Sequence, residues 1–171
     1  MEFKIPFYNI LNMFLTGLTF LGGLVLLHPD VFINIISNRI WMEFSTGFEI
    51  IFVICVFSAV YEVGLIFNRL GSVLIEYLLI KIKIIKFDEN YKEYNDVKKN
   101  YPIMDTLSRE YSLSRTSLTL FLILAILAFI ECKNKLCGLF LIIMIIFLLS
   151  CKKHSKRILK LIGSEESGED K

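Results

Sequence analysis

The chain has 171 residues, of which 55% are hydrophobic and 21% charged, and its net charge at pH 7 is only +2. We expect no direct nucleic-acid binding, because the membrane topology predicted below already accounts for the positions of the basic residues. The apolar residues form long blocks, and a block of about 18 residues or more can cross the ~30 Å hydrocarbon core of a bilayer as a helix. A soluble helical bundle is disfavoured, because helices that are apolar on every face need lipid around them. We therefore expect an all-α membrane protein with four transmembrane helices and a short helical cytoplasmic stem and linker between spans 2 and 3.

The first span, within residues 1–28, is an uncharged apolar block that carries a stripe of polar and small residues. At 100° per residue, these residues fall within roughly 80° of one another on the helix. They are Asn9, Asn12, Thr16, Thr19 and Gly23. Such a stripe either packs against a neighbouring helix or lines a water-filled path. We favour packing, because Thr and Gly let membrane helices approach closely and Asn hydrogen-bonds between them.

The outer connection, residues 29–46, follows the first span. Its apolar and polar residues are arranged so that a short helix would lie at the membrane interface. We expect Trp41 to anchor this helix at headgroup depth.

The second span, residues 47–68, holds the most informative residue of the sequence, Glu62. It lies about 22 Å from the outer end of the helix and therefore inside the membrane. Ionisable groups at such depth are costly and normally face a partner or a cavity. We expect Glu62 to pair with Arg115, at the inner start of the third span, or with Arg69 of another subunit. An ion pair that fixes helix register is favoured over proton or ion handling, because a transporter usually has more polar groups in its membrane helices.

The second helix has two distinct faces if it continues beyond its span, because steps of seven residues drift by only about 20°. One face carries the polar and charged positions Cys55, Ser58, Glu62, Arg69 and Glu76. The opposite face carries Gly64, Gly71 and, beside them, Asn68. A helix with a charged face and a glycine face leaves little surface for lipid. We therefore expect it to be buried on both faces.

The cytoplasmic stem and linker, residues 69–112, connect the second and third spans. The stretch Ile80–Phe87 fits either a helical extension or a short strand, and we expect Pro102 to open a helix that runs directly into the third span. This region is too small and too polar to be an enzyme domain with its own core. The sequence also contains no catalytic, cofactor-binding or metal-binding motif. We therefore expect a protein that is not an enzyme and has no cofactor.

The third span (residues 113–132) and the fourth (136–151) form a hairpin around an outer turn, residues 133–135. The apolar run of the fourth span reaches only about 24 Å, so it requires local thinning of the bilayer or help from its flanks. Cys132 and Cys137 flank the turn and would pair in an oxidising compartment.

The tail, residues 152–171, is first basic and then acidic. Its basic positions are Lys152, Lys153, Lys156, Arg157 and Lys160. They either hold an amphipathic helix on anionic lipid headgroups, at about 1 kcal/mol per basic residue, or are ordinary charges that flank a membrane span.

The distribution of basic residues predicts the orientation of the chain. One Lys precedes the first span, nine Lys or Arg lie from Arg69 to Arg115, and six lie in the tail, against three on the opposite side. Lys and Arg concentrate in cytoplasmic loops. We therefore expect a multi-pass protein of the cell membrane with both termini in the cytoplasm.

Two short segments carry a resemblance to known proteins. The inner end of the second span has the pattern Tyr61-x-x-Gly64-x4-Arg69-x-Gly71-Ser72-x3-Glu76, and the segment before the third has the pattern Arg109-Glu110-Tyr111-Ser112-x-x-Arg115. These patterns resemble small four-span prokaryotic membrane proteins of unassigned chemistry, including some encoded in phage-defence loci. The resemblance implies a membrane-embedded partner or effector that assembles as an oligomer and is triggered from the cytoplasm.

Two functional hypotheses follow from the sequence. The first is a non-enzymatic homo-oligomer that engages a cytoplasmic protein partner or signal, as a membrane effector of a prokaryotic antiviral defence system would. The alternative is a small ion channel or transporter that uses the polar face of spans 1 and 2.

Overall fold

The computed structural model describes residues 7–37, 46–85, 101 and 103–166, and every regular element within these residues is helical. In chain order, the elements are α1 (Phe7–Leu27), α2 (Pro29–Ser37), α3 (Thr46–Leu70), the π-helix η2 (Gly71–Ile75), α4 (Glu76–Lys81), α6 (Ile103–Ile130) and α7 (Asn134–Glu166). Within these described residues, four helical segments are long and apolar enough to cross a membrane: Phe7–Leu27, Gly47–Lys81, Ile103–Ile130 and Asn134–Gly163. The prediction of an all-helical chain with four candidate membrane spans is confirmed.

The short helix α2 occupies the first part of the predicted outer connection. It exposes apolar side chains at Val31, Ile33 and Ile35. The predicted anchor Trp41 lies outside the described residues, as does most of the linker between α4 and α6.

The last two helices are longer than the apolar runs that predicted them. Helix α6 has 28 residues and begins at Ile103, directly after Pro102, as expected from the sequence. Helix α7 has 33 residues and continues from its apolar half through the basic segment to Glu166. At 1.5 Å per residue, these helices are about 42 Å and 50 Å long. Lys and Arg are good helix formers, so the end of an apolar run did not mark the end of a helix.

Helix α3 continues beyond the predicted inner end of its span, first as η2 and then as α4. In η2 the backbone N–H of Glu76 donates to the carbonyl of Gly71, five residues earlier. The helix ends at Lys81, and Lys83 then adopts a positive φ of 60°. The ambiguous stretch Ile80–Phe87 therefore contains the end of a helix and a turn over its described residues.

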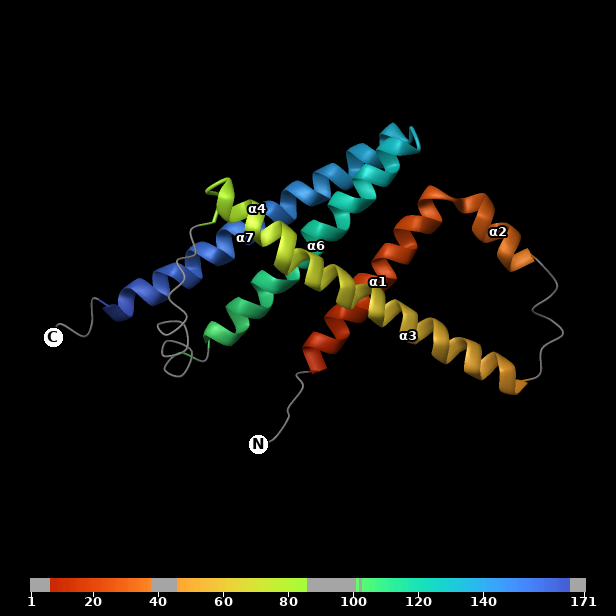
Figure 1. Cartoon of the computed structure of the whole chain (residues 1–171), viewed down its shortest axis with the longest axis horizontal. Helices are drawn as coiled ribbons and strands as arrows, with labels where there is room; N and C mark the ends of the chain where they lie inside the picture. The colour runs from red at the N-terminus through yellow and green to blue at the C-terminus, as the bar shows by residue number, and fades with distance from the viewer. Residues whose placement is uncertain (1–6, 38–45, 86–100, 102, 167–171) are drawn as a thin grey trace. The chain divides into compact units, whose positions relative to one another are not determined.

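The chain divides into two compact units, and α3, α6 and α7 each contribute to both. Unit 1 comprises Met1–Phe67 and Leu120–Leu141, and unit 2 comprises Asn68–Thr119 and Ile142–Lys171. Figure 1 shows the course of each helix through the chain.

Unit 1 is organised by a close crossing of α1 and α3, which is visible in Figure 1. A Cβ atom built on Gly17 would lie 1.8 Å from the carbonyl oxygen of Val60, and one on Gly64 would lie 1.7 Å from that of Met13. Each helix therefore presents a glycine to the backbone of the other. Small residues permit this kind of contact between membrane helices.

The apolar core of unit 1 lies where α1 and α3 meet the second half of α6 and the start of α7. Its buried members are Leu27, Phe67, Leu120, Leu124, Ala125, Ala128 and Phe140. The rings of Phe20 and Phe67 lie 4.9 Å apart. At one end of the core, Nε2 of His28 lies 3.4 Å from Oε1 of Glu131, which joins the end of α1 to the end of α6.

Candidate functional site

Unit 2 contains a polar cluster around Arg115, which we call the Arg115 cluster. Its members are Asn68, Glu76, Tyr111, Ser112, Arg115 and Thr116. The guanidinium of Arg115 forms an ion pair with the carboxylate of Glu76, and their side chains are only 12% and 24% exposed. One turn earlier on α6, the ring of Tyr111 lies beneath this guanidinium, with 5.6 Å between Cζ and the ring centroid. The phenol of Tyr111 also interacts with Glu76.

The partner of Arg115 corrects a sequence prediction, because Glu76 takes the place that we expected Glu62 to take. The π-helix η2 accounts for the position of Glu76. A π-helical turn contains about one residue more than an α-helical turn, and this rotates every later residue by roughly 100° about the helix. Glu76 is therefore turned away from the face that carries Glu62 and Arg69.

Asn68 and Gly71 also contact α6 within unit 2. Oδ1 of Asn68 accepts hydrogen bonds from the hydroxyls of Ser112 at 3.3 Å and Thr116 at 3.0 Å. A Cβ atom on Gly71 would lie 3.0 Å from Oγ1 of Thr119. The sequence placed Asn68 beside the glycine face, and these contacts show what that face packs against.

A second set of polar contacts joins α6 to α7 within unit 2. Oε2 of Glu110 lies 3.1 Å from Nδ1 of His154, and the hydroxyls of Ser114 and Ser150 lie 2.8 Å apart. On each helix, the two contacting residues are four positions apart and therefore lie on the same face. The two contacts form a short ladder between antiparallel helices. Sequence analysis missed this ladder. The only available signal was the matching spacing of Glu110 with Ser114 and of Ser150 with His154.

The polar stripe of α1 is divided between buried and exposed positions in unit 1. Thr16 and Gly23 are buried, Asn12 is half-buried, and Asn9 and Thr19 are exposed. The hydroxyls of both threonines donate 2.8 Å hydrogen bonds to carbonyls of their own helix, four residues earlier. A Cβ atom on Gly23 would lie 2.7 Å from the side chain of Leu124. The last residue of the stripe, Gly23, therefore packs against an apolar side chain of α6.

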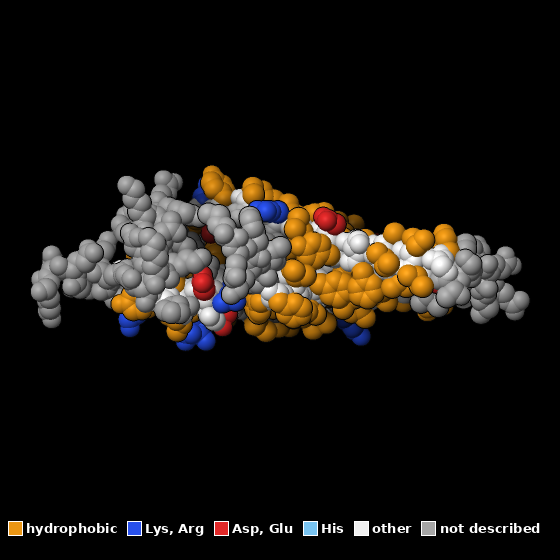
Figure 2. All heavy atoms as spheres, turned by 90° about the horizontal axis from the view of Figure 1, so that it is seen from below, with side chains coloured by type: hydrophobic (Ala, Val, Ile, Leu, Met, Phe, Trp, Pro, Cys, Tyr) orange, Lys and Arg blue, Asp and Glu red, His pale blue; other side chains and the backbone are white. Residues whose placement is uncertain are grey.

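Glu62 and Arg69 are both exposed, and the described residues offer neither of them an ion-pair partner. Within the single chain, the expectation that both faces of this helix are buried is wrong for the charged face. Every residue from Gly47 to Ala59 is exposed as well, because α1 covers α3 only around their crossing. Figure 2 shows one side of the chain, on which hydrophobic side chains cover wide areas with few charged side chains among them.

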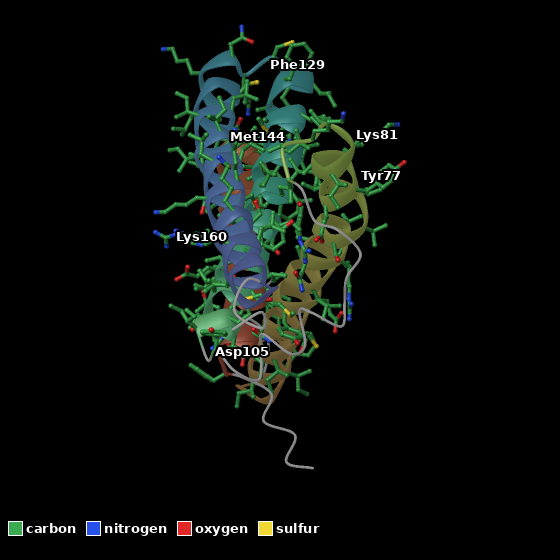
Figure 3. The ribbon with its side chains drawn as sticks, turned by 90° about the vertical axis from the view of Figure 1, so that its left-hand side faces the viewer. Tyr77, Lys81, Asp105, Phe129, Met144 and Lys160 are labelled. Atoms are coloured by element: carbon green, nitrogen blue, oxygen red, sulfur yellow. The ribbon has the colours of Figure 1, made fainter. Side chains whose placement is uncertain are left out.

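The basic segment of α7 has one packed face and one exposed face in unit 2. All five predicted headgroup residues are exposed: Lys152, Lys153, Lys156, Arg157 and Lys160. Between them, Cys151, Ser155 and Ile158 are buried. Figure 3 shows Lys160 pointing away from its helix, and it shows Tyr77 and Lys81 pointing away from α4.

The polar groups described above form ion pairs and hydrogen bonds between helices. The described residues contain no group of three His, Cys, Asp or Glu side chains that would hold a metal ion. Cys132 and Cys137 are free thiols, as are Cys55 and Cys151. Comparison with protein-family models, with curated proteins and with solved structures finds no match.

Proposed function

We propose that this chain is a non-enzymatic subunit of a homo-oligomeric membrane assembly. The observation that carries the proposal is the exposure of Glu62 on a helix that is apolar for most of its length. Lipid can cover the apolar side chains of α3, but it provides no partner for a carboxylate in the hydrocarbon core. The single chain provides no partner among the described residues either. A second subunit can supply one.

The proposal includes an input from the cytoplasm, because the distribution of basic residues leads us to expect both termini there. In that orientation, unit 2 contains the inner ends of α3, α6 and α7, and the Arg115 cluster links Asn68 and Glu76 to α6. A π-helix within a longer helix often marks a functional position. A soluble partner or signal that rearranges the Arg115 cluster would act on helices that continue into the membrane. The resemblance to proteins of phage-defence loci suggests an antiviral effector as the biological setting.

We expect the purified protein, kept in native lipid, to have the mass of a defined homo-oligomer. The measurement is native mass spectrometry or mass photometry of particles extracted without removal of their lipid. A monomer at membrane-like concentrations would contradict the proposal.

The same preparation tests the channel or transporter alternative, which is favoured by the exposed face of Glu62 and Ser58. If that face lines a conducting path, liposomes will show an ion or proton flux that Glu62→Gln changes and Leu149→Ala, on an exposed apolar face of α7, leaves intact. The α1 stripe lends this alternative little support, because the hydroxyls of Thr16 and Thr19 are already bonded to their own helix. If neither the wild-type protein nor the variants show flux, the channel or transporter alternative is excluded, and the proposed role in an assembly still stands.

The basic segment of α7 is proposed to bind anionic lipid headgroups at the inner membrane surface. Its five exposed basic residues follow directly on the apolar half of the same helix. On α4, Lys81 lies 5.9 Å from the ring centroid of Tyr77, and aromatic and basic residues of this kind are typical of a membrane interface. Basic residues near an anionic surface each contribute about 1 kcal/mol.

Replacement of Lys152, Lys153 and Lys156 with glutamine is expected to reduce the retention of anionic lipid strongly. Three basic residues correspond to about 3 kcal/mol, or roughly a hundredfold change in affinity. The measurement is native mass spectrometry of lipid adducts after exchange into a defined mixture of anionic and zwitterionic lipid. Lys133→Gln with Lys135→Gln, at the opposite end of the hairpin, is the matched control. Equal losses in the two proteins would contradict a specific role for α7.

A further inference from the structure

The segment formed by η2 and α4 exposes large apolar side chains on one side, which we call the stem face. Its members are Val73, which is 69% exposed, Tyr77, which is 62% exposed, and the exposed residues Leu74 and Leu78. The segment belongs to the helical stretch Gly47–Lys81, which is apolar enough to cross a membrane. An exposed apolar surface of this kind marks a contact with lipid or with another protein.

Two contacts of α6 fix the height of the stem face relative to α7 within unit 2. The hydroxyl of Ser114 lies 2.8 Å from that of Ser150 on α7, and the next residue of α6, Arg115, forms the ion pair with Glu76. Because these two residues of α6 are adjacent, Glu76 and Ser150 lie at about the same height along the helices. On α7, the large exposed apolar side chains end at this height, with Leu149.

Polar and apolar residues around this height are arranged in the opposite way to those of a soluble helical bundle. Glu76 is turned inward, where it pairs with Arg115, and the hydroxyls of Thr116 and Thr119 are buried. Outward, the stem face and Leu149 of α7 are apolar. Lipid favours this arrangement, because acyl chains accommodate apolar side chains and offer polar groups no hydrogen-bond partner.

The arrangement reverses in the part of unit 2 formed by the start of α6 and the end of α7. Met104, Leu107 and Ile158 are buried there, whereas Asp105 and Lys156 are exposed. This is the ordinary pattern of helices that pack together in water. The change from an apolar to a polar exterior therefore occurs within unit 2, between the stem face and these residues.

We propose that η2 and α4 lie in the membrane, with Tyr77 and Lys81 at the level of the lipid headgroups. Both side chains point away from α4 (Figure 3), and Nζ of Lys81 lies 5.9 Å from the ring centroid of Tyr77. Aromatic and basic residues are enriched at this level of a bilayer. The partner of the stem face is then the acyl chains and glycerol region of one leaflet. The membrane boundary moves from Asn68, where the apolar run predicted it, to Tyr77, about 13 Å farther along the helix.

A bilayer accounts for the surroundings of the stem face better than a docked protein does. It surrounds α4 and α7 at one height, and both helices are apolar outside at that height. Arg69 is exposed about 12 Å deeper than Tyr77 along the helix. Its long side chain covers part of this distance by snorkelling toward the headgroups, and local thinning of the bilayer covers the rest. The inference extends the lipid contact proposed for the basic segment of α7 and is independent of the oligomeric state.

The test is the quenching of single tryptophans by brominated lipid in liposomes. Val73→Trp and Ile103→Trp form a matched pair in a chain that carries Trp41→Phe, because both positions expose an apolar side chain and only Val73 belongs to the stem face. We expect phosphatidylcholine with brominated acyl chains to reduce the emission of Val73→Trp about twofold or more, because an interfacial side chain lies about 5–10 Å deep at the acyl boundary. The emission of Ile103→Trp should hardly change. Leu149→Trp is the positive control on α7.

Acrylamide, dissolved in the water on both sides of the bilayer, should quench these proteins in the reverse order. Equal lipid quenching of Val73→Trp and Ile103→Trp, or quenching of Val73→Trp by acrylamide alone, would overturn the inference. Protection of Val73→Trp from both quenchers would also overturn it and would indicate that a protein covers the stem face. If Val73→Trp lowers the thermal midpoint, Leu74→Trp, at the next exposed position, takes its place under the same criteria.

The positive control separates this inference from the proposed function. Failure at Val73→Trp with lipid quenching at Leu149→Trp would overturn the position of η2 and α4 and leave the membrane assembly standing. Absence of lipid quenching at Leu149→Trp as well would contradict the membrane location on which both proposals depend.

Discussion

Gly64→Ala is expected to destabilise the folded chain by about 2–4 kcal/mol, because it inserts a methyl group into a backbone contact. The added Cβ atom would lie 1.7 Å from the carbonyl oxygen of Met13. No rotation of a side chain can relieve this overlap, since the obstructing atom belongs to the main chain. The helices α1 and α3 would have to move apart by more than 1 Å, and the reciprocal contact of Gly17 with Val60 would loosen with them.

The thermal midpoint of the purified protein in mild detergent, followed by circular dichroism, measures this effect. Gly17→Ala should cause a loss of similar size, because its Cβ atom would lie 1.8 Å from the Val60 carbonyl oxygen. Gly22→Ala is the matched control on the same helix. It meets no atom within 4 Å and should be neutral or slightly stabilising, by up to about 1 kcal/mol. Equal midpoints for all three variants would show that α1 and α3 do not cross through these glycines.

Arg115→Ala is expected to destabilise unit 2 by about 3 kcal/mol, because it leaves the carboxylate of Glu76 without its counter-charge. Removal of one member of a buried ion pair typically costs about 3–5 kcal/mol. The lower end applies here, since the side chain of Glu76 remains 24% exposed. The loss of the guanidinium also removes the contact with the ring of Tyr111.

A double-mutant cycle separates the ion pair from these additional contacts. Glu76→Gln with Arg115→Gln should cost less than the sum of the two single changes, because neither partner is then left charged and alone. Lys153→Ala, an exposed basic residue of α7, is the control for the loss of one positive charge. Strict additivity, measured by thermal unfolding of the four proteins, would contradict the pairing of Glu76 with Arg115.

Properties that depend on local sequence were predicted well. The four candidate spans follow from uninterrupted apolar length, and the start of α6 at Ile103 follows from the fixed backbone of Pro102. The shared face of Gly64 and Gly71 follows from helical periodicity, and both glycines are buried. The apolar run predicted too short a helix for α7. A change from apolar to polar residues indicates where a membrane span ends, but the helix itself can continue.

The contacts of the candidate site could be predicted only in part. Sequence periodicity identified Glu76 and Arg115 as important but assigned Arg115 to Glu62. The π-helix from Gly71 to Ile75 rotates Glu76 and so makes it, rather than Glu62, the partner of Arg115. No residue in the sequence GSVLI predicts a π-helical turn. The contacts of His154 with Glu110 and of Ser150 with Ser114 join positions 36 residues or more apart in the chain. Their register depends on how α6 packs against α7.

By itself, the sequence determined that this is an all-helical chain with four candidate membrane spans, because apolar length and helix-breaking residues act within a few turns of the chain. It also predicts that Glu62 lies within a candidate membrane span, where an ionisable side chain would be costly. The tertiary structure decided which charges are satisfied inside the chain. Packing against α6 gives Arg115 a partner in Glu76, and packing against α1 occupies the glycine face of α3. Glu62 and Arg69 remain on the face that these contacts leave open, because a helix can pack closely on one side and still present the other to a second molecule.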